Sequence, residues 1–133
     1  MKRVLIMGLP GSGKTYLAEQ IFNRLCRQFM IVWFNADQVR EDFDDWDFSI
    51  EGRLRQARRM KKLADVSEAD FTICDFVAPL EQMRELYKPH YTIWLDTIKD
   101  SKFEDTNKIF IPPTKVNLRL ESWDYDLELI TTN

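Results

Sequence analysis

Three glycines, a lysine and a threonine near the amino terminus have the spacing of a phosphate-binding loop. After an apolar run, the chain reads a glycine, four further residues and then Gly-Lys-Thr. Glycines let backbone amides approach phosphate oxygens without a Cβ in the way, and a helix that begins here directs the positive end of its dipole at the same group. Lys14 can reach the β- and γ-phosphates, and Thr15 can hold Mg²⁺. The predicted nucleotide-binding residues are Gly8, Leu9, Pro10, Gly11, Ser12, Gly13, Lys14, Thr15 and Tyr16.

Polar side chains also follow two later apolar segments. Asp75 comes directly after Phe71-Thr72-Ile73-Cys74, and the polar stretch 35–40 comes directly after the apolar run 30–34. The carboxyl ends of strands are where open parallel α/β sheets bind ligands. A carboxylate at such an end can hold the water shell of a metal bound to a nucleotide. We therefore expect Thr15 and Asp75 to form the Mg²⁺ site.

The elements that position these residues alternate between strands and helices. Apolar runs predict strands at 3–7, 30–34, 71–74 and 91–96, and an alternating pattern predicts an edge strand at 116–123. Helical spacing of apolar residues predicts helices at 16–29, 50–68 and 80–87. This order predicts an α/β fold, a three-layer sandwich whose sheet has about five parallel strands with helices on both faces. We expect the phosphate loop to follow the central strand, and residues 97–115 to form a loop that can order over substrate.

Composition limits the class of protein. The 133 residues are expected to form one domain, and the aliphatic and aromatic content of 44% is typical of a globular chain. The net charge of −3 argues against a broad nucleic-acid or membrane surface. Neither a signal peptide nor an apolar span of membrane length is evident, so we expect a cytoplasmic location. We expect Cys26 and Cys74 to be unpaired, buried thiols and His90 to be a loop or surface residue.

Several segments, taken together, resemble the motifs of one enzyme family. Residues 8–15 are close to Gly-Leu-Ser-Gly-Ser-Gly-Lys-Ser, and residues 35–40 resemble Asp-Gly-Asp-Asn-Val-Arg. Phe48-Ser49 with Arg53 and Arg58-Arg59 resembles a third motif, and residues 75–79 and 103–113 resemble two more. The chain thus resembles the adenylylsulfate kinases, which use Mg-ATP to phosphorylate the 3′-hydroxyl of adenosine 5′-phosphosulfate. The resemblance implies the fold of the P-loop nucleoside triphosphate hydrolases, with ATP and Mg²⁺ as cofactors.

The resemblance also implies roles for individual residues. Asp37 would contact the acceptor hydroxyl as the candidate base, while Arg40 and Arg53 would grip the phosphosulfate. Phe48 and Phe103 would sandwich the adenine, although ordinary core packing is an equal alternative for both rings. Guanidinium groups suit anionic oxygens and aromatic faces suit a purine, which supports these roles on chemical grounds. The predicted catalytic residues are Lys14 and Asp37, and the predicted acceptor-binding residues are Asp37, Arg40, Phe48, Arg53, Gln56, Phe76 and Phe103.

Two departures from the family pattern bear on function. Asn35 stands where the family has its first acid, and Asp75 adds an acid that the family lacks and that can compensate. The cationic lid of the family is shortened here to residues 97–102, with Lys99 and Lys102 as its cations. Lid cations stabilise charge on the transferring phosphoryl group and exclude water. Either these two lysines suffice or the acceptor has changed.

Other functions therefore stay open beside the leading hypothesis, a kinase with adenosine 5′-phosphosulfate as acceptor. The nearest alternative is a kinase of the same fold acting on a modified nucleoside, a sugar acid or a nucleic-acid end, for which the basic stretch 53–62 offers charge. A nucleotide-dependent switch and a non-catalytic nucleotide binder are two further classes. We expect ATP and a small anionic acceptor as partners, no membrane and no nucleic acid, and we leave a homodimer open.

Overall fold

A sheet of five parallel strands forms the centre of the computed structural model, which describes residues 2–131. Its order is β2-β3-β1-β4-β5, so β1, which leads into the phosphate loop, is the central strand, as the sequence predicts. Short apolar runs form these strands because side chains on both faces are covered by other elements. The strands are β1 Lys2–Met7, β2 Ile31–Asn35, β3 Phe71–Asp75, β4 Tyr91–Leu95 and β5 Leu118–Leu120.

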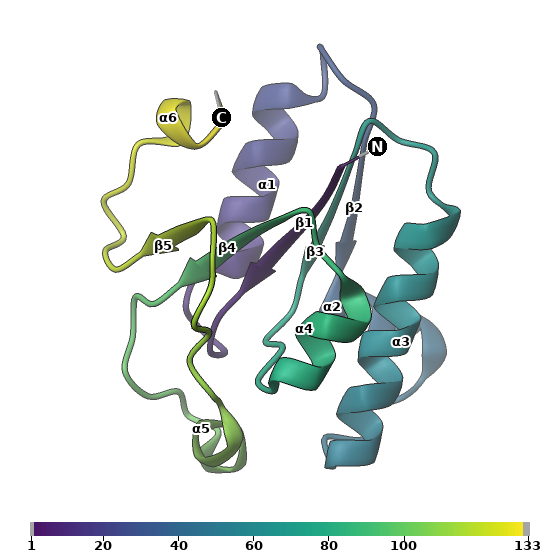
Figure 1. The fold of residues 1–133 in the computed structure, drawn as a ribbon, viewed down its shortest axis with the longest axis vertical. Coiled ribbons are helices and arrows are strands. Elements are labelled where there is room, and N and C mark those ends of the chain that lie inside the picture. The colour runs from purple at the N-terminus through teal and green to yellow at the C-terminus, as the bar shows by residue number, and fades with distance from the viewer. Residues whose placement is uncertain (1, 132–133) are drawn as a thin grey trace.

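Helices cover both faces of this sheet (Figure 1). Helices α1 and α6 lie on one face, and α2, α3 and α4 lie on the other (Figure 1). Helix α5 lies beyond the carboxyl ends of the strands, at the bottom of the view. The three-layer α/β architecture is therefore confirmed. The helices are α1 Lys14–Leu25, α2 Ala36–Phe43, α3 Ile50–Val66, α4 Glu81–Tyr87, α5 Glu104–Ile109 and α6 Leu127–Thr131.

Two clusters of buried side chains hold the layers together. The cluster beneath α1 is built from aliphatic residues of the sheet and one stripe of the helix, as the predicted spacing requires. Its buried members are Ile6, Leu17, Ala18, Ile21, Ile73, Ile93 and Leu95. The cluster beneath α3 and α4 contains Leu5, Met7, Val39, Ala57, Met60, Ala64, Cys74, Phe76, Ala78, Met83, Tyr87 and Trp94.

Several local predictions differ from the structure. Helix α2 was not predicted, because Val39 is its single buried apolar residue and the pattern of the segment is mostly polar. Within the stretch expected to be a loop, residues 104–109 form α5, and the expected edge strand 116–123 is reduced to Leu118–Leu120. Helix α1 ends at Leu25, so Cys26 is exposed rather than buried, while Cys74 is buried and both thiols are free as expected. His90 is exposed in the loop before β4, as predicted.

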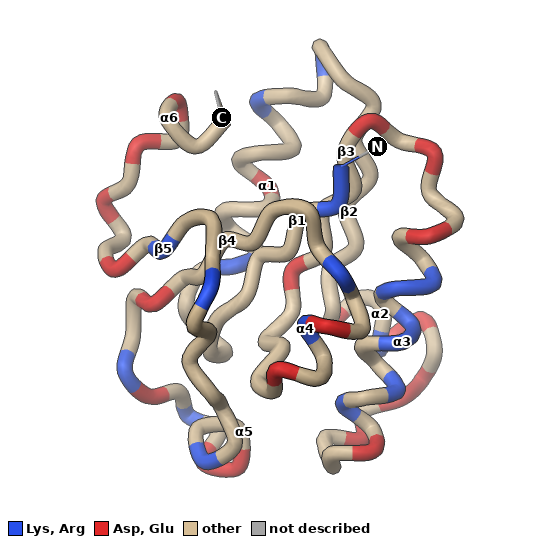
Figure 2. Tube along the Cα trace, in the orientation of Figure 1, with Lys and Arg blue, Asp and Glu red and all other residues tan. Residues whose placement is uncertain are grey.

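Parallel strands bring their carboxyl ends to one edge of the sheet. The phosphate loop after β1 lies there with Asn35 at the end of β2 and Asp75 at the end of β3, which pair with each other in the sheet register. Charged residues of both signs gather beside this edge around α2 and α3 (Figure 2). Among the residues 2–131, no helix is long and apolar enough to cross a membrane.

Candidate active site

The loop after β1 has the backbone conformation that the glycines of the motif permit. Gly13 has φ 100° and precedes the first residue of α1, a left-handed conformation that disfavours any side chain. A Cβ on Gly8 would lie 2.6 Å from the carbonyl oxygen of Leu95, so only glycine fits where the loop passes the end of β4. The amides from Gly11 onward thus precede the amino terminus of α1 on a tight curve, which is the arrangement that binds phosphate.

The ammonium group of Lys14 lies inside this curve. Its Nζ donates a hydrogen bond to the carbonyl oxygen of Leu9 at 3.0 Å and bridges the two ends of the loop. Burial lowers the pKa of Lys14 from 10.5 to about 8, while the carboxylates of Asp75 and Asp37 partly offset this effect. A cation held beside carboxylates in a desolvated position attracts an anion strongly, and the phosphates of a nucleotide supply one.

Asp75 lies behind the loop in a network of hydrogen bonds. Its side chain is 2% exposed, and it accepts from Trp33 Nε1 and from Asn35 Nδ2, each at 2.9 Å. Burial raises the pKa of Asp75 to about 6, although both hydrogen bonds and the charge of Lys14 act in the opposite direction. Keeping the buried carboxyl of Asp75 ionised therefore costs the folded protein free energy, which is common for carboxylates at functional sites.

Asn35 connects the possible metal ligands to each other and to α2. Its Nδ2 donates to Thr15 Oγ1 at 3.0 Å as well as to Asp75, and its Oδ1 accepts from the backbone amide of Gln38 at 3.0 Å. The last of these bonds caps the amino terminus of α2. Asn35 therefore holds the hydroxyl of Thr15 beside the carboxylate of Asp75, two hard oxygen donors of the type that Mg²⁺ prefers.

Asp37 and Arg40 lie on α2, next to this network. Asp37 is exposed in the first turn of the helix, and its charge acts on both Lys14 and Arg40. Arg40 is 5% exposed and its Cζ lies 4.4 Å from the ring centroid of Phe48, which is itself exposed. Its Nη1 donates to the carbonyl oxygens of Asp45 at 3.0 Å and Asp47 at 3.2 Å, so the backbone of the 44–49 loop fixes the guanidinium.

Arg53 of α3 joins the two segments that carry the predicted aromatic pair. It is 5% exposed, and its Nε donates to the carbonyl oxygen of Phe48 at 2.8 Å. Its Nη2 donates to Thr106 Oγ1 at 2.8 Å in α5, the helix that begins directly after Phe103. Phe48 and Phe103 are both exposed rather than packed in the core. Because both side chains are buried, loss of hydration lowers the pKa of Arg40 and of Arg53.

Two predicted acceptor residues are already engaged within the protein. Gln56 is buried, its Nε2 donates to the carbonyl oxygen of Ala36 and its Oε1 accepts from Arg59. Its amide therefore ties α2 to α3. Phe76 is buried and packs edge-on against Tyr87, with ring centroids 5.8 Å apart. The structure thus brings Arg40 and Arg53 to the ring of Phe48, with Asp37 on the same helix as Arg40, while Gln56 and Phe76 are buried and engaged by other residues of the protein.

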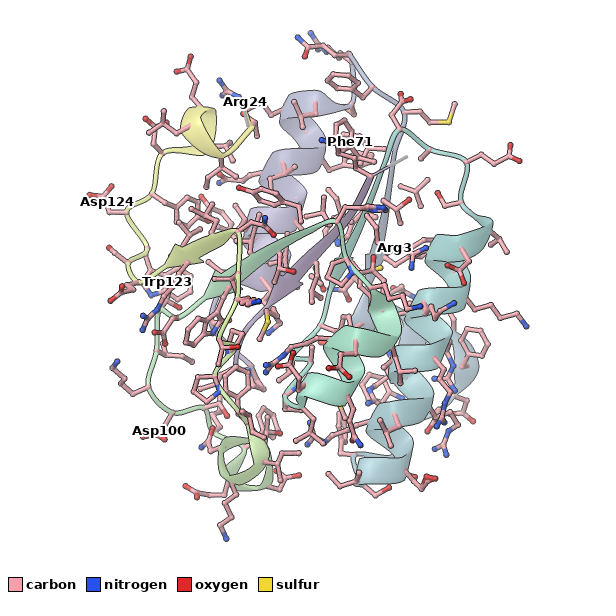
Figure 3. All side chains as sticks on the ribbon, viewed as in Figure 1. Arg3, Arg24, Phe71, Asp100, Trp123 and Asp124 are labelled. Atoms are coloured by element: carbon pink, nitrogen blue, oxygen red, sulfur yellow. The ribbon has the colours of Figure 1, made fainter. Side chains whose placement is uncertain are left out.

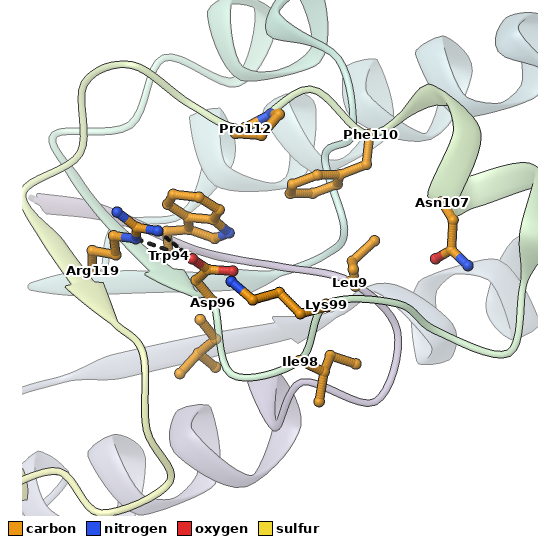
Figure 4. Close-up of a pocket in the computed structure, with 10 residues that line it drawn as sticks. Leu9, Trp94, Asp96, Ile98, Lys99, Asn107, Phe110, Pro112 and Arg119 are labelled. Carbon is orange, nitrogen blue, oxygen red and sulfur yellow. Dashed lines mark hydrogen bonds and ion pairs between the residues drawn. The ribbon is translucent and has the colours of Figure 1, made fainter.

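The shortened lid is tied to the phosphate loop at its start. Thr97 Oγ1 donates to the carbonyl oxygen of Ser12 at 2.8 Å. Beyond it, Lys99 lines a cavity of about 320 Å³ together with Trp94, Asp96, Phe110 and Arg119 (Figure 4). Arg119 stacks on Trp94 and donates to Asp96 (Figure 4). None of the predicted acceptor residues lines this cavity, which belongs to the β4–β5 side of the loop.

Trp33 was missed by the sequence reasoning. Its indole N–H contacts Asp75 because β2 and β3 pair in parallel, with Trp33 opposite Ile73 and Asn35 opposite Asp75. A strand tryptophan two residues before the end of a predicted strand carries no local signal of such a role. The contact with Asp75 could be predicted only from the knowledge that β2 and β3 are neighbours in the sheet.

Comparisons with known proteins relate the chain to one family and to several solved structures. The family model described as adenylylsulphate kinase matches residues 2–99. The structure of the Mycobacterium tuberculosis APS kinase CysC in complex with AMPPNP and APS is similar, with TM-score 0.78, 19% identity, and coverage of 98% of this chain and 93% of that one. A hexameric APS kinase from Thiobacillus denitrificans gives TM-score 0.73, 20% identity and coverage of 98% and 27%. Shikimate kinase from Aquifex aeolicus gives TM-score 0.63, 14% identity and coverage of 98% and 87%.

At these identities the structural likeness establishes the fold alone. No curated protein sequence matches the chain.

Proposed function

The chain belongs to the adenylylsulphate kinase family, and from this premise we propose that its acceptor is a small anionic nucleotide, with adenosine 5′-phosphosulfate as the leading candidate. As a member of this family, it is an ATP-dependent phosphotransferase that acts on a hydroxyl. One observation carries the choice of acceptor. Two buried guanidinium groups, those of Arg40 and Arg53, lie against the exposed ring of Phe48.

The two arginines favour an anionic acceptor. Arg40 and Arg53 are held mainly by carbonyl oxygens and a hydroxyl, and the carboxylate nearest to Arg53, that of exposed Asp105, is 3.5 Å away. The carboxylate of Asp45, whose charge acts on Arg40, already pairs with Arg55 and Arg59. Because a buried cation that is only partly neutralised is costly, the site gains free energy when an anion arrives. Guanidinium groups bind the oxygens of phosphate and sulfate through paired, charge-assisted hydrogen bonds.

The exposed rings favour an acceptor that carries a base. Phe48 has one face stacked on Arg40, with the Cζ of Arg53 5.4 Å from the same ring centroid. Phe103, also exposed, precedes the helix that Arg53 bonds through Thr106. Arg53 therefore connects the two segments that carry these exposed aromatic side chains, and each ring offers a stacking surface for a purine.

The residues around the loop support in-line transfer from a bound nucleotide. The loop amides and Lys14 would hold the phosphates, and Asp37, exposed on the adjoining helix, would orient or deprotonate the acceptor hydroxyl. Thr15 and Asp75 would hold Mg²⁺ on the nucleotide, with Asn35 keeping the two side chains together. Mg²⁺ bound there neutralises charge on the β- and γ-phosphates. Among residues 2–131, no group of three or more His, Cys, Asp or Glu side chains is arranged to hold a metal ion.

The lid favours a second candidate, a kinase of another hydroxyl such as that of a modified nucleoside, a sugar acid or a nucleic-acid end. Lys99, one of its two cations, lines the cavity beside Asp96 and Arg119 instead of the acceptor residues. Gln56, which would help to hold phosphosulfate, is engaged by Ala36 and Arg59. These two observations weaken the case for phosphosulfate without affecting the case for a kinase.

We place the protein in the cytoplasm. Cys26 and Cys74 are free thiols, as a reducing compartment requires, and ATP is supplied there. For its assembly, we retain a homodimer as the simplest oligomer to test, by sedimentation of the purified chain.

The acceptor is tested by isothermal titration of adenosine 5′-phosphosulfate into the protein saturated with Mg-ADP. We expect micromolar binding that the Arg53→Ala variant loses. Arg58→Ala is the matched control, because Arg58 is an exposed arginine on the same helix, and it should bind as the wild type does. Absence of binding at millimolar ligand would refute this acceptor and leave the second candidate.

A further inference from the structure

We propose that Trp123 is the stacking platform for the base of the nucleotide donor, and that the site consequently discriminates little between adenine and guanine. The proposal rests on the proposed function only in taking the phosphate loop as the donor site. Trp123 lies in the loop after β5, beside Asp124 at the left of the view in Figure 3.

Trp123 contacts the phosphate loop directly. A Cβ placed on Gly13 would lie 2.4 Å from Cζ3 and 2.9 Å from Cη2 of Trp123, so the benzene edge of the indole lies against the Cα of Gly13. Gly13 immediately precedes α1, whose first amides face the phosphates. The ring is therefore adjacent to one end of the phosphate-binding site.

The segments on either side of Trp123 are anchored to the sheet and to α1, and they keep the ring in this position. On its amino-terminal side, the carbonyl oxygen of Leu120 accepts from the backbone amide of Asp96 at 2.8 Å, at the end of β4. On its carboxyl-terminal side, Tyr125, Leu127 and Ile130 pack on the cluster beneath α1. Trp123 stands between two anchored segments, so its ring does not need to be buried to stay at the loop.

The orientation of the phosphate chain brings the base to this side. The proposed Mg²⁺ ligands mark the side of the γ-phosphate, because Asn35 at the end of β2 holds the hydroxyl of Thr15 beside Asp75 at the end of β3. The γ end therefore lies on the β2–β3 side of β1. The opposite end, which carries the nucleoside, must run toward β4 and β5, and the loop with Trp123 follows β5.

The exposure of the ring agrees with a binding surface. Trp123 is 54% exposed, although tryptophan is usually well covered in a folded domain. Tyr16, exposed one helical turn after Gly13, adds a second aromatic side chain at the start of α1. An indole face stacks on any base, because every base has a π-face, and it reads no hydrogen-bond pattern. Stacking thus supplies affinity without discrimination between the two purines.

Equilibrium binding of Mg-ADP, Mg-GDP and inorganic tripolyphosphate, without any acceptor, tests the proposal. For the wild type, we expect the two nucleotides to bind within about threefold of each other. Trp123→Ala should weaken both by roughly 5- to 150-fold, the loss expected for one stacked base, and leave tripolyphosphate unchanged. Trp123→Phe should recover much of the loss. Phe29→Ala, which removes an exposed aromatic from the segment between α1 and β2, is the control and should bind like the wild type.

Several outcomes would overturn the proposal. Trp123→Ala could bind both nucleotides as tightly as the wild type does, or it could lose as much affinity for tripolyphosphate as for the nucleotides. The wild type could also prefer Mg-ADP to Mg-GDP by more than about tenfold. If Trp123 only anchored the segment after β5, Trp123→Ala would lower thermal stability without separating nucleotides from tripolyphosphate. A kinase that phosphorylates no acceptor would refute the proposed function while leaving these binding results intact, so the two failures are distinguishable.

Discussion

The stability of Asp75→Asn, relative to that of the wild type, is expected to rise progressively as the pH increases from 4 to 7. Burial raises the pKa of Asp75 from 3.8 to about 6 in the folded state, and unfolding returns it to its ordinary value. The contribution of the protonated carboxyl to stability is complete below about pH 4 and is lost as the pH rises through about 6. The asparagine variant has no such dependence, so the difference between the two proteins isolates one ionisation.

The magnitude follows from the two pKa values. One pH unit corresponds to about 1.4 kcal/mol, so ionising the 2% exposed Asp75 costs the folded state about 3 kcal/mol when titration is complete. About 2 kcal/mol of this develops between pH 4 and 7. The side-chain amide must also meet the donors of Trp33 and Asn35, but that cost is the same at every pH.

Urea unfolding of both proteins at half-unit intervals from pH 4 to 7 measures this effect. The free energy of unfolding of Asp75→Asn minus that of the wild type should increase by about 2 kcal/mol over the range. A difference that stays constant within about 0.5 kcal/mol would refute the raised pKa of Asp75. The same variant should lose most of its Mg-ADP affinity, because the carboxylate is the proposed metal ligand.

Two further predictions concern the neighbours of Asp75. Binding of Mg-ADP should take up a proton above about pH 8, because the pKa of Lys14 is lowered to about 8 in the free protein and the phosphates raise it again. Titration calorimetry in buffers of different ionisation enthalpy measures this proton uptake. Lys14→Met should abolish it. Asn35→Asp should lower stability at pH 8 by about 1–3 kcal/mol, because two bonds donated by Nδ2 are lost and a second carboxylate then lies beside Asp75. In a thermal-shift assay, Mg-ADP should raise the melting temperature of Asn35→Asp by more than it raises that of the wild type. A melting temperature without nucleotide that equals that of the wild type would contradict the role of Asn35 in holding Thr15 beside Asp75.

The parts of the fold with strong local signals were predictable. The phosphate loop, the central position of β1, the two long helices α1 and α3 and the short helix α4 were all predicted from the sequence. Helix α2 did carry a signal, since Asn35 caps it and Asp37 occupies its first turn, but its mostly polar pattern hid it. Strand β5 is shorter than the alternating pattern of 116–123 because only Leu118, Arg119 and Leu120 pair with β4.

The site was less predictable than the fold because its contacts join distant segments. Arg40 and Arg53 were singled out, but their stacking on Phe48 depends on the turn between α2 and α3. The bond from Trp33 to Asp75 depends on strand order, and the contact of Trp123 with Gly13 depends on how the loop after β5 returns to α1. Gln56 is the opposite case, because its type suits acceptor binding while its amide in fact bonds the backbone of Ala36.

Transfer of labelled γ-phosphate from Mg-ATP to adenosine 5′-phosphosulfate measures directly whether this compound is the acceptor. We predict a product labelled at the 3′-hydroxyl, consumption of ATP that depends on the acceptor, and loss of both in Asp37→Asn. ATP consumption that is the same with and without acceptor would exclude transfer to this compound, and a product labelled to the same extent in wild type and Asp37→Asn would exclude Asp37 as the base.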